Sequence, residues 1–474
     1  MPEQYQANPP DSSGAERGGA APGGATHGGA SRGGAAPDAA GRGGAAIRGS
    51  SAGAIAASVE AAVAAGRLAA GAPLPSVRAL ASELGVSPTT VAAALAQLRR
   101  RGVVVSRPRS GTRVAERPSL RASRPAATVP AGARDLASGS PDARLLPPLG
   151  PVLHALAAPQ RLYGEDPVLP ELAAVAGPAF AADGIPADRL CVVNGALDGI
   201  ERVLAAHLSP GDAVAVEDPG WPGVLDVARI LGLRLTPVAV DARGMLPGAL
   251  AAAQHAGARA VVHTPRGHNP CGAALDAERA AALRAVLAPE VLVIEDDHLG
   301  PVAGTPWHTL VEGRDRWAAV RSVSKWLGPD LRLAVLAGDE STLARVEGRQ
   351  SLGPGWVSGL AQRLVAALWA DPEVLAGVER AAAAYRERRE ALAARVDAAP
   401  APSGINLWIP VPDEDAAVRA LLADGWAVAA GTPYRLGTGP AIRITTATVE
   451  IDEAPRLAAA VERAVRPARR TRAA

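Results

Sequence analysis

Short apolar segments alternate with longer alanine-rich segments throughout residues 135–474, and this alternation constrains the fold more than any other feature. The longer segments have the spacing of amphipathic helices, which predicts strands joined by helices. Strands joined in this way form a mostly parallel sheet with helices on both faces. Because the region is longer than an average domain, we expect a smaller C-terminal α+β lobe. We expect strands at residues 190–193, 213–217, 260–264, 291–295, 319–323 and 333–337.

Most of these strands are followed by residues that can bind a ligand. The carboxyl ends of parallel strands meet at one edge of a sheet, which is where α/β proteins bind their ligands. The first of these sites opens a helix, whose free N–H groups and positive dipole end suit an anion. In chain order the candidates are Gly195, Ala196 and Leu197; Trp221; Asn269; Asp296, Asp297 and His298; and Ser322, Lys325 and Arg332.

Lys325 is the only lysine in the chain, against 48 arginines. A guanidinium stays protonated and cannot attack an aldehyde, whereas a lysine can lose its proton and do so. The retained amine therefore points to covalent chemistry, with chance retention as the alternative. A pyridoxal 5′-phosphate (PLP) site needs such an amine, a carboxylate for the ring nitrogen, an aromatic face and a phosphate cradle. The residues after the strands offer a candidate for each of these needs.

The overall composition places few limits on the partners of the chain. A formal net charge of +2 produces no global field that would point to nucleic acid or membrane. Cys191 and Cys271 have no metal-like spacing, so we expect no metal site and a reducing, cytoplasmic setting. We expect neither a signal peptide nor a transmembrane helix, since the apolar runs are too short.

The N-terminal part of the chain has a different composition. Residues 1–50 are rich in Gly, Ala, Pro and Arg and are expected to form a disordered tail. Residues 51–114 contain eight arginines and two acidic residues, a local excess that suits a phosphate backbone. Residues 115–134, rich in Pro, Arg and Ala, read as a linker to a domain at 135–474. Within 51–114 we expect helices at 52–65, 76–84 and 88–101 and two short strands at 102–105 and 112–114.

This region resembles the GntR-type winged helix-turn-helix. The resemblance rests on Gly66-Arg67-Leu68, Leu74-Pro75-Ser76-Val77-Arg78, Leu84-Gly85-Val86-Ser87, Thr89-Thr90-Val91 and the wing from Ser106 to Thr112. It implies that double-stranded DNA is a partner and that the third helix enters the major groove by its N-terminal end. The alternative is that the arginines only solvate a small helical bundle. The implied DNA contacts are Arg78, Ser87, Thr89 and Thr90, with Arg107, Arg109 and Gly111 on the wing.

Residues 135–474 resemble the fold-type-I, aspartate-aminotransferase-like PLP domain, and the fusion as a whole resembles the MocR branch of GntR regulators. The markers are Ser138-Gly139-Ser140-Pro141, Tyr163-Gly164, Asn269-Pro270-Cys271-Gly272, Glu295-Asp296-Asp297 and Ser322-Val323-Ser324-Lys325. The resemblance implies that Lys325 and Asp296 are catalytic, with Asp297 as the alternative partner of the ring nitrogen. It also implies that Trp221 stacks on the ring, that Asn269 and His298 bond its oxygen, and that Arg443 binds a substrate carboxylate. The phosphate would be held by Gly195, Ala196, Leu197, Ser322 and Arg332.

Two positions depart from the family pattern. At Gly267-His268-Asn269, where MocR proteins vary, the chain looks more like plain aminotransferases. The family usually has a tyrosine after the acidic pair, where this chain has His298. A histidine can donate the same hydrogen bond, but it is expected to titrate near neutrality and to tune the cofactor differently. Both departures leave PLP binding intact and put turnover in doubt.

Three functions remain open on the sequence alone. The leading hypothesis is a PLP-dependent transcriptional regulator that senses an amine, an amino acid or PLP itself through Lys325. The second is a working aminotransferase with an accessory DNA-binding domain, and the third is a non-catalytic PLP reservoir. The resemblance also implies a homodimer, whose two winged helices would read two half-sites.

Overall fold

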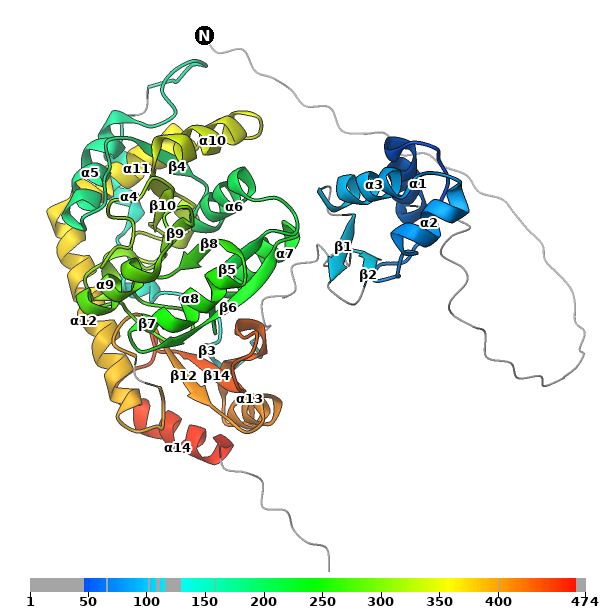
Figure 1. Cartoon of the computed structure of the whole chain (residues 1–474). Coiled ribbons are helices and arrows are strands. Elements are labelled where there is room, and N and C mark those ends of the chain that lie inside the picture. Colours follow the sequence, from blue (N-terminus) through cyan, green and yellow to red (C-terminus); the bar gives the residue numbers. More distant parts are fainter. Residues whose placement is uncertain are drawn as a thin grey trace, which may run out of the picture. The chain divides into compact units, whose positions relative to one another are not determined.

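The computed structural model describes residues 47–64, 67–100, 103–107, 111–115, 129–157, 159–399 and 401–465, although the side chains of Ala64, Arg100 and Arg107 are left out. The predicted tail at residues 1–50 therefore lies almost wholly outside the described residues, as does most of the predicted linker. The described parts are a small N-terminal module and a large C-terminal domain (Figure 1). Each is considered by itself below.

The N-terminal module has three helices followed by a two-stranded antiparallel wing. Its apolar residues recur at helical spacing and are buried in one core, which includes Ile55, Val59, Leu80 and Leu95. The second helix is capped by Ser76, whose side chain accepts a hydrogen bond from the N–H of Ala79. The elements are α1 (Ala52–Ala64), α2 (Val77–Leu84), α3 (Pro88–Arg100), β1 (Val104–Arg107) and β2 (Gly111–Val114), close to the predicted ranges.

The C-terminal domain is built on an eight-stranded sheet with the order β4-β11-β10-β9-β8-β5-β6-β7. The five central strands from β10 to β6 are parallel to one another, and the strands at both edges pair antiparallel. The parallel strands are buried along their length, as expected for a sheet covered on both faces, except β6 near the edge and Arg259 of β8. The strands are β4 (Leu190–Val193), β5 (Ala213–Asp218), β6 (Arg234–Asp241), β7 (Gly244–Met245), β8 (Ala258–His263), β9 (Leu292–Asp297), β10 (Trp317–Ser322) and β11 (Ala334–Gly338).

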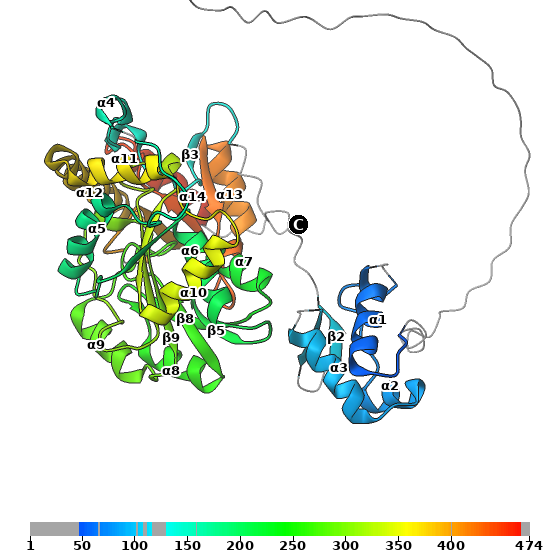
Figure 2. The same cartoon turned by 90° about the horizontal axis from the view of Figure 1, so that it is seen from above.

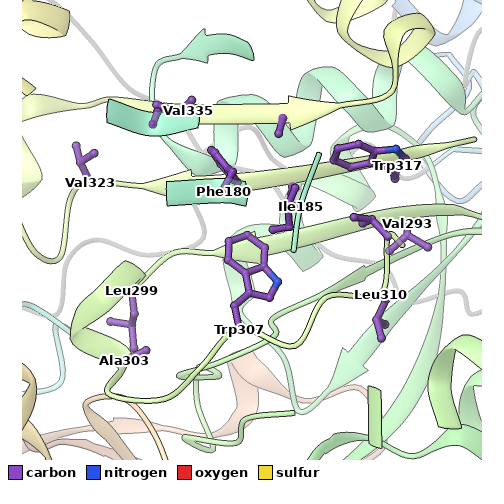
Figure 3. Packing of buried hydrophobic residues seen from close by; sticks show 14 of the residues in the cluster. Phe180, Ile185, Val293, Leu299, Ala303, Trp307, Leu310, Trp317, Val323 and Val335 are labelled. Atoms are coloured by element: carbon purple, nitrogen blue, oxygen red, sulfur yellow. The ribbon is translucent and has the colours of Figure 1, made fainter. Parts of the chain in front are cut away.

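Helices cover both faces of this sheet (Figure 1), as the sequence predicts. One face packs against α6 (Ala196–His207), α7 (Pro222–Ile230) and α10 (Glu340–Ser351). The other face packs against α5 (Pro170–Ala182), α8 (Pro247–His255), α9 (Ala277–Val286) and α11 (Gly359–Ala370), with α4 (Leu149–Ala155) beside α11. Figure 3 shows the core on this second face, where Phe180, Ile185 and Trp307 pack under Val293 and Trp317 of the sheet.

The C-terminal lobe contains a four-stranded sheet with the order β12-β14-β13-β3, beside which α13 and α14 pack (Figure 2). Its edge strand β3 pairs in parallel with β13 and begins at Arg134, the last residue of the predicted linker. The elements are β3 (Arg134–Leu136), α12 (Pro372–Ala393), β12 (Asn406–Pro410), α13 (Glu414–Ala423), β13 (Trp426–Ala430), β14 (Ala441–Thr445) and α14 (Ala454–Val465). Short 3-10 turns lie at η2 (Ala143–Leu145), η3 (Gly300–Ala303), η4 (Pro329–Leu331) and η5 (Thr432–Tyr434).

Among the described residues, no helix is by itself long and apolar enough to cross a membrane. The one pair that reaches that length and composition together, Val77–Leu84 with Pro88–Arg99, bends by 115° between its members.

Candidate PLP site and DNA-binding surface

The register of the large sheet brings the predicted site residues to one edge. Asp296 on β9 lies opposite Val320 on β10, so the chain beyond both strands leaves the sheet at the same level. On the antiparallel side, Val193 of β4 pairs with Ala334 of β11, which places Gly195 and Arg332 near each other. The fold therefore gathers residues that are far apart in the chain at the carboxyl edge of the parallel strands.

Lys325 follows β10 and is half-buried at this edge. Its Nζ donates a hydrogen bond of 2.6 Å to the carbonyl oxygen of Gly139. Burial, with a smaller contribution from the Arg443 guanidinium, lowers the pKa of the Lys325 ammonium to about 8. A larger share of this amine is thus neutral and nucleophilic near neutral pH than for an ordinary lysine.

Asp296 is the penultimate residue of β9, and its carboxylate is buried at the same edge of the sheet. Neither of its side-chain oxygens has a hydrogen-bond partner within the described part of the chain. Burial, followed by the nearby charges of Asp297 and Glu217, raises the pKa of Asp296 to about 8. A buried carboxyl without a donor is costly, and a protonated ring nitrogen is the kind of partner that would satisfy it.

Unlike Asp296, Asp297 has hydrogen-bond donors at both of its side-chain oxygens. It receives hydrogen bonds of 2.9 Å from Arg266, through both Nε and Nη2, and another of 2.9 Å from Nε of Arg321. Although burial alone would raise the pKa of Asp297, these guanidinium groups lower it to about 2. The alternative assignment of Asp297 to the ring nitrogen is therefore disfavoured by the geometry, because its oxygens are already occupied.

Trp221 and His298 present parallel rings to each other. Their centroids lie 6.5 Å apart, with an angle of 16° between the ring planes. Burial, together with the charge of Lys325, lowers the pKa of His298 to about 3. The expectation that His298 titrates near neutrality is therefore wrong, since the imidazole is neutral throughout the physiological range.

The N-terminus of α6 forms an anion cradle with an arginine beside it. Gly195 caps this helix with a φ of 92°, and a Cβ at this position would lie 3.1 Å from Nη2 of Arg332. Ser322 is buried nearby on β10 and its hydroxyl lies 2.8 Å from that of Ser324. Helix N–H groups, a hydroxyl and a guanidinium are the donors that phosphate requires.

Arg443 on β14 reaches the same site from the C-terminal lobe. Its guanidinium donates to the carbonyl oxygen of Ala137 and, at 3.3 Å, to the side-chain oxygen of Asn269, and it lies 5.1 Å from the ring centroid of Tyr434. Asn269 and Arg443 are therefore held together, although the sequence assigns them separate roles.

The structure also reveals a buried pair that the sequence analysis did not assign. Nε2 of His268 lies 3.2 Å from Oε2 of Glu217, although its direction does not suit a hydrogen bond. Burial alone would lower the pKa of His268, but the Glu217 carboxylate raises it to about 10. Glu217 and Asp296 line one cavity with Trp221. Both acids and the histidine lie in recognisable motifs, but nothing in their spacing indicates that they meet.

The predicted DNA contacts lie on exposed parts of the N-terminal module. Arg78, Ser87 and Thr89 are exposed, and Thr90 is half-buried. The hydroxyl of Ser87 caps α3 by accepting from the N–H of Thr90 at 3.1 Å. Gly111 begins β2 with a φ of 74°. Arg107 is described only through its backbone, and Arg109 lies outside the described residues.

Comparisons with known proteins agree with the division into an N-terminal DNA-binding module and a C-terminal domain. The family of bacterial regulatory proteins of the gntR type matches residues 51–114, and the class I and II aminotransferase family matches residues 168–461. The vitamin B6 salvage pathway transcriptional repressor PtsJ of Salmonella typhimurium is 40% identical over 421 residues, which cover 86% of this chain and 97% of PtsJ. This chain belongs to the MocR branch of GntR-type transcriptional regulators.

Two further regulators resemble this MocR-type chain. TauR of Rhodobacter capsulatus is 30% identical over 385 residues, covering 71% of this chain and 77% of TauR. The pyridoxine biosynthesis regulator PdxR of Corynebacterium glutamicum is 31% identical over 249 residues, covering 50% of this chain and 53% of PdxR. The kynurenine aminotransferase structure of Pyrococcus horikoshii matches with a TM-score of 0.63 at 19% identity, over 70% of this chain and 91% of that structure. This last likeness establishes the fold-type-I architecture of the C-terminal domain.

PLP is the cofactor of this MocR-type regulator, and the site fits it. The orphaned oxygens of Asp296 suit the ring nitrogen, and the lowered pKa of Lys325 suits attack on an aldehyde. A Cβ at Gly195 would crowd the guanidinium of Arg332, at 3.1 Å from Nη2, and the φ of 92° there favours glycine. These residues supply the donors and acceptors that PLP needs.

Proposed function

We propose that this regulator senses PLP itself through Lys325 and changes its affinity for DNA in response. The observation that carries the proposal is an unpartnered carboxyl, that of Asp296, at the same edge of the sheet as a lysine whose pKa is lowered to about 8. A site that leaves an acid unsatisfied and an amine reactive is poised for an aldehyde-bearing pyridine. PtsJ and PdxR, whose names refer to vitamin B6 salvage and pyridoxine biosynthesis, support PLP over an unrelated amine as the effector.

Each residue of the site has a role in this proposal. Lys325 forms the covalent bond, Asp296 binds the ring nitrogen and Trp221 packs on the ring face. His298 donates to the ring oxygen as a neutral imidazole, and Asn269 assists it. Bound PLP supplies an aldehyde carbon that accepts an amine nitrogen. The phosphate is held by Gly195, Ala196, Leu197, Ser322 and Arg332.

A DNA-binding assay tests the proposal. Fluorescence anisotropy with the fragment upstream of the protein's own gene should show a change in affinity when PLP is added to the wild-type protein. Lys325→Ala should bind the same fragment without responding to PLP, and its absorbance at 400–430 nm should not rise. An equal affinity of the wild-type protein with and without PLP would refute effector sensing.

A second candidate function is transamination, which Arg443 favours. A buried guanidinium beside the reactive amine is the group that would bind the carboxylate of an amino acid. Incubation with an amino acid and 2-oxoglutarate would produce a keto acid if the domain turns over. The absence of any keto acid, with PLP bound, would leave regulation as the sole role.

We further propose that the protein acts as a homodimer. Leu162, Tyr163 and Leu352 expose between 73% and 92% of their surface, and Tyr163 packs edge-on against Trp356 at 5.5 Å. Exposed large apolar side chains gathered by such contacts favour an interface. Light scattering of the wild type and of Tyr163→Asp should give a dimer and a monomer respectively. A wild-type monomer would contradict the proposal.

A further inference from the structure

The segment between β3 and η2 crosses the PLP site with one carbonyl turned toward Lys325. We call residues 137–141 the strap. Gly139 and Pro141 are buried, whereas Ser138 and Ser140 are exposed. The strap therefore presents backbone to the site and hydroxyl groups to the outside.

The strap is fixed at both ends. At its N-terminal end, Leu136 is fully buried and β3 pairs with β13. At its C-terminal end, Asp142 accepts from Arg388 at 3.0 Å, and its N–H donates to the hydroxyl of Tyr385 at 3.1 Å. A change in the five residues between these anchors therefore acts directly on β3 at one end and on Asp142 at the other.

Two cations of the PLP site hold the middle of the strap. Lys325 donates to the carbonyl of Gly139 at 2.6 Å, and Arg443 donates to the carbonyl of Ala137. A Cβ at Gly139, where φ is 69°, would lie 3.2 Å from Nη1 of Arg443. The strap is thus packed directly on the two groups that a ligand of this site would engage.

Along the chain, the strap follows β3 directly. β3 is the first strand of the C-terminal domain, and the residues before it lead back to β2 of the winged helix. We propose, on the basis of the function proposed above, that the strap reports the state of the Lys325 amine to the DNA-binding module. An element with two arrangements, biased by the site at one end, is what such coupling requires.

The chemistry of the amine provides the switch. When the amine attacks an aldehyde, its nitrogen forms a C=N bond, and the carbonyl oxygen leaves as water with both amine hydrogens. The nitrogen then has no hydrogen left for Gly139 unless it takes up a proton, and any such proton would be directed to the ring oxygen. The strap would lose one of its two cationic donors, while Arg443 would remain.

Two substitutions of Lys325 should lock the strap in opposite states. Lys325→Arg keeps a cationic donor that cannot react with an aldehyde, so it should resemble the free protein whether or not PLP is present. Lys325→Met keeps the bulk without a donor, so it should resemble the PLP-bound protein even in the absence of PLP. Pyridoxine 5′-phosphate, which lacks the aldehyde, is the matched control ligand.

Hydrogen–deuterium exchange of the full-length protein provides the test. In the wild type, PLP should make the amides of residues 137–140 exchange about tenfold faster, as expected for the loss of one charge-assisted hydrogen bond. Pyridoxine 5′-phosphate should leave them unchanged, and Lys325→Met should exchange fast throughout. Equal effects of both ligands, or a strap that PLP does not alter, would overturn the proposal.

The DNA affinity of the two Lys325 variants distinguishes a role of the strap from effector sensing in general. Lys325→Met without ligand should bind the upstream fragment with the affinity of the PLP-bound wild type, and Lys325→Arg with that of the free wild type. If PLP changes DNA affinity while exchange in the strap stays unaltered, the strap does not connect Lys325 to the DNA-binding module, and the proposed function stands. If the strap responds and DNA affinity does not, effector sensing itself fails.

Discussion

Replacing Asp296 by asparagine should stabilise the protein without PLP and weaken its affinity for PLP. Asp296 has a pKa of about 8 in the folded protein, mainly because it is buried, against an ordinary value of 3.8. Above pH 4 the unfolded chain releases this proton while the folded protein keeps it. The contribution of Asp296 to stability is therefore full at low pH and is lost as the pH rises toward 8.

The magnitude follows from the distance between the two pKa values. The free energy of unfolding falls by about 1.36 kcal/mol for each pH unit above the pKa of the unfolded chain. Between that pKa and pH 7 lie about three pH units, so about 4 kcal/mol of stability is lost by pH 7. An asparagine has no proton to lose and escapes this penalty. Its amide cannot pair with a protonated ring nitrogen, however, and the loss of a charged hydrogen bond should weaken PLP binding by about ten- to a hundredfold.

Thermal unfolding of the PLP-free protein at pH 5, 7 and 8 measures the first effect, and absorbance titration with PLP measures the second. The adjacent Asp297→Asn is the matched control. It would leave Arg266 and Arg321 without their buried carboxylate, and this should cost about 3–5 kcal/mol. If Asp296→Asn proves less stable than the wild type at pH 8, or binds PLP equally well, the assignment of Asp296 is incorrect.

Three further substitutions test the remaining parts of the two sites. His268→Gln removes the imidazolium beside Glu217 and should weaken PLP binding about tenfold in an absorbance titration, because an unpaired carboxylate then remains near Asp296; unchanged affinity would argue against the pair. With the pKa of His298 at about 3, the 400–430 nm band of the loaded protein should show no step near pH 6.5; a step that His298→Tyr abolishes would contradict this. Arg78→Ala should weaken binding to all DNA sequences alike and reduce the salt slope by about one in anisotropy titrations; a loss confined to one sequence would assign Arg78 to base recognition.

The strands that could be predicted from the sequence are those that contain a buried apolar run. β9 and β10 are buried at every position, and their apolar runs mark them within two residues. β6 gives no such signal, because it lies near the edge, exposes several residues and contains Pro237. β3 is three residues long and pairs with a strand almost 300 residues away, which no local pattern indicates.

The choice between Asp296 and Asp297 shows a second limit. Neighbouring residues on a strand face opposite sides of the sheet, so one of the two acids must point away from any ligand. Which one does so depends on Arg266, in the loop after β8, and on Arg321 of β10, whose guanidinium groups bind Asp297. The motif therefore predicts a carboxylate at the site but cannot say which residue supplies it.

The contacts of Lys325 and Arg443 with residues 137–141 explain why a single lysine matters. The other 48 residues in the lysine and arginine count are arginines, which cannot form an imine with an aldehyde. An aldehyde can therefore remove the hydrogen bond between Lys325 and Gly139 while the guanidinium of Arg443 keeps its hold on Ala137. Lysines elsewhere in the chain would offer competing amines, and a lysine in place of Arg443 would let one ligand release both donors. Because the chain has one lysine, an aldehyde can form an imine with one side chain only. The reaction therefore breaks a single hydrogen bond, the one from Lys325 to the carbonyl of Gly139.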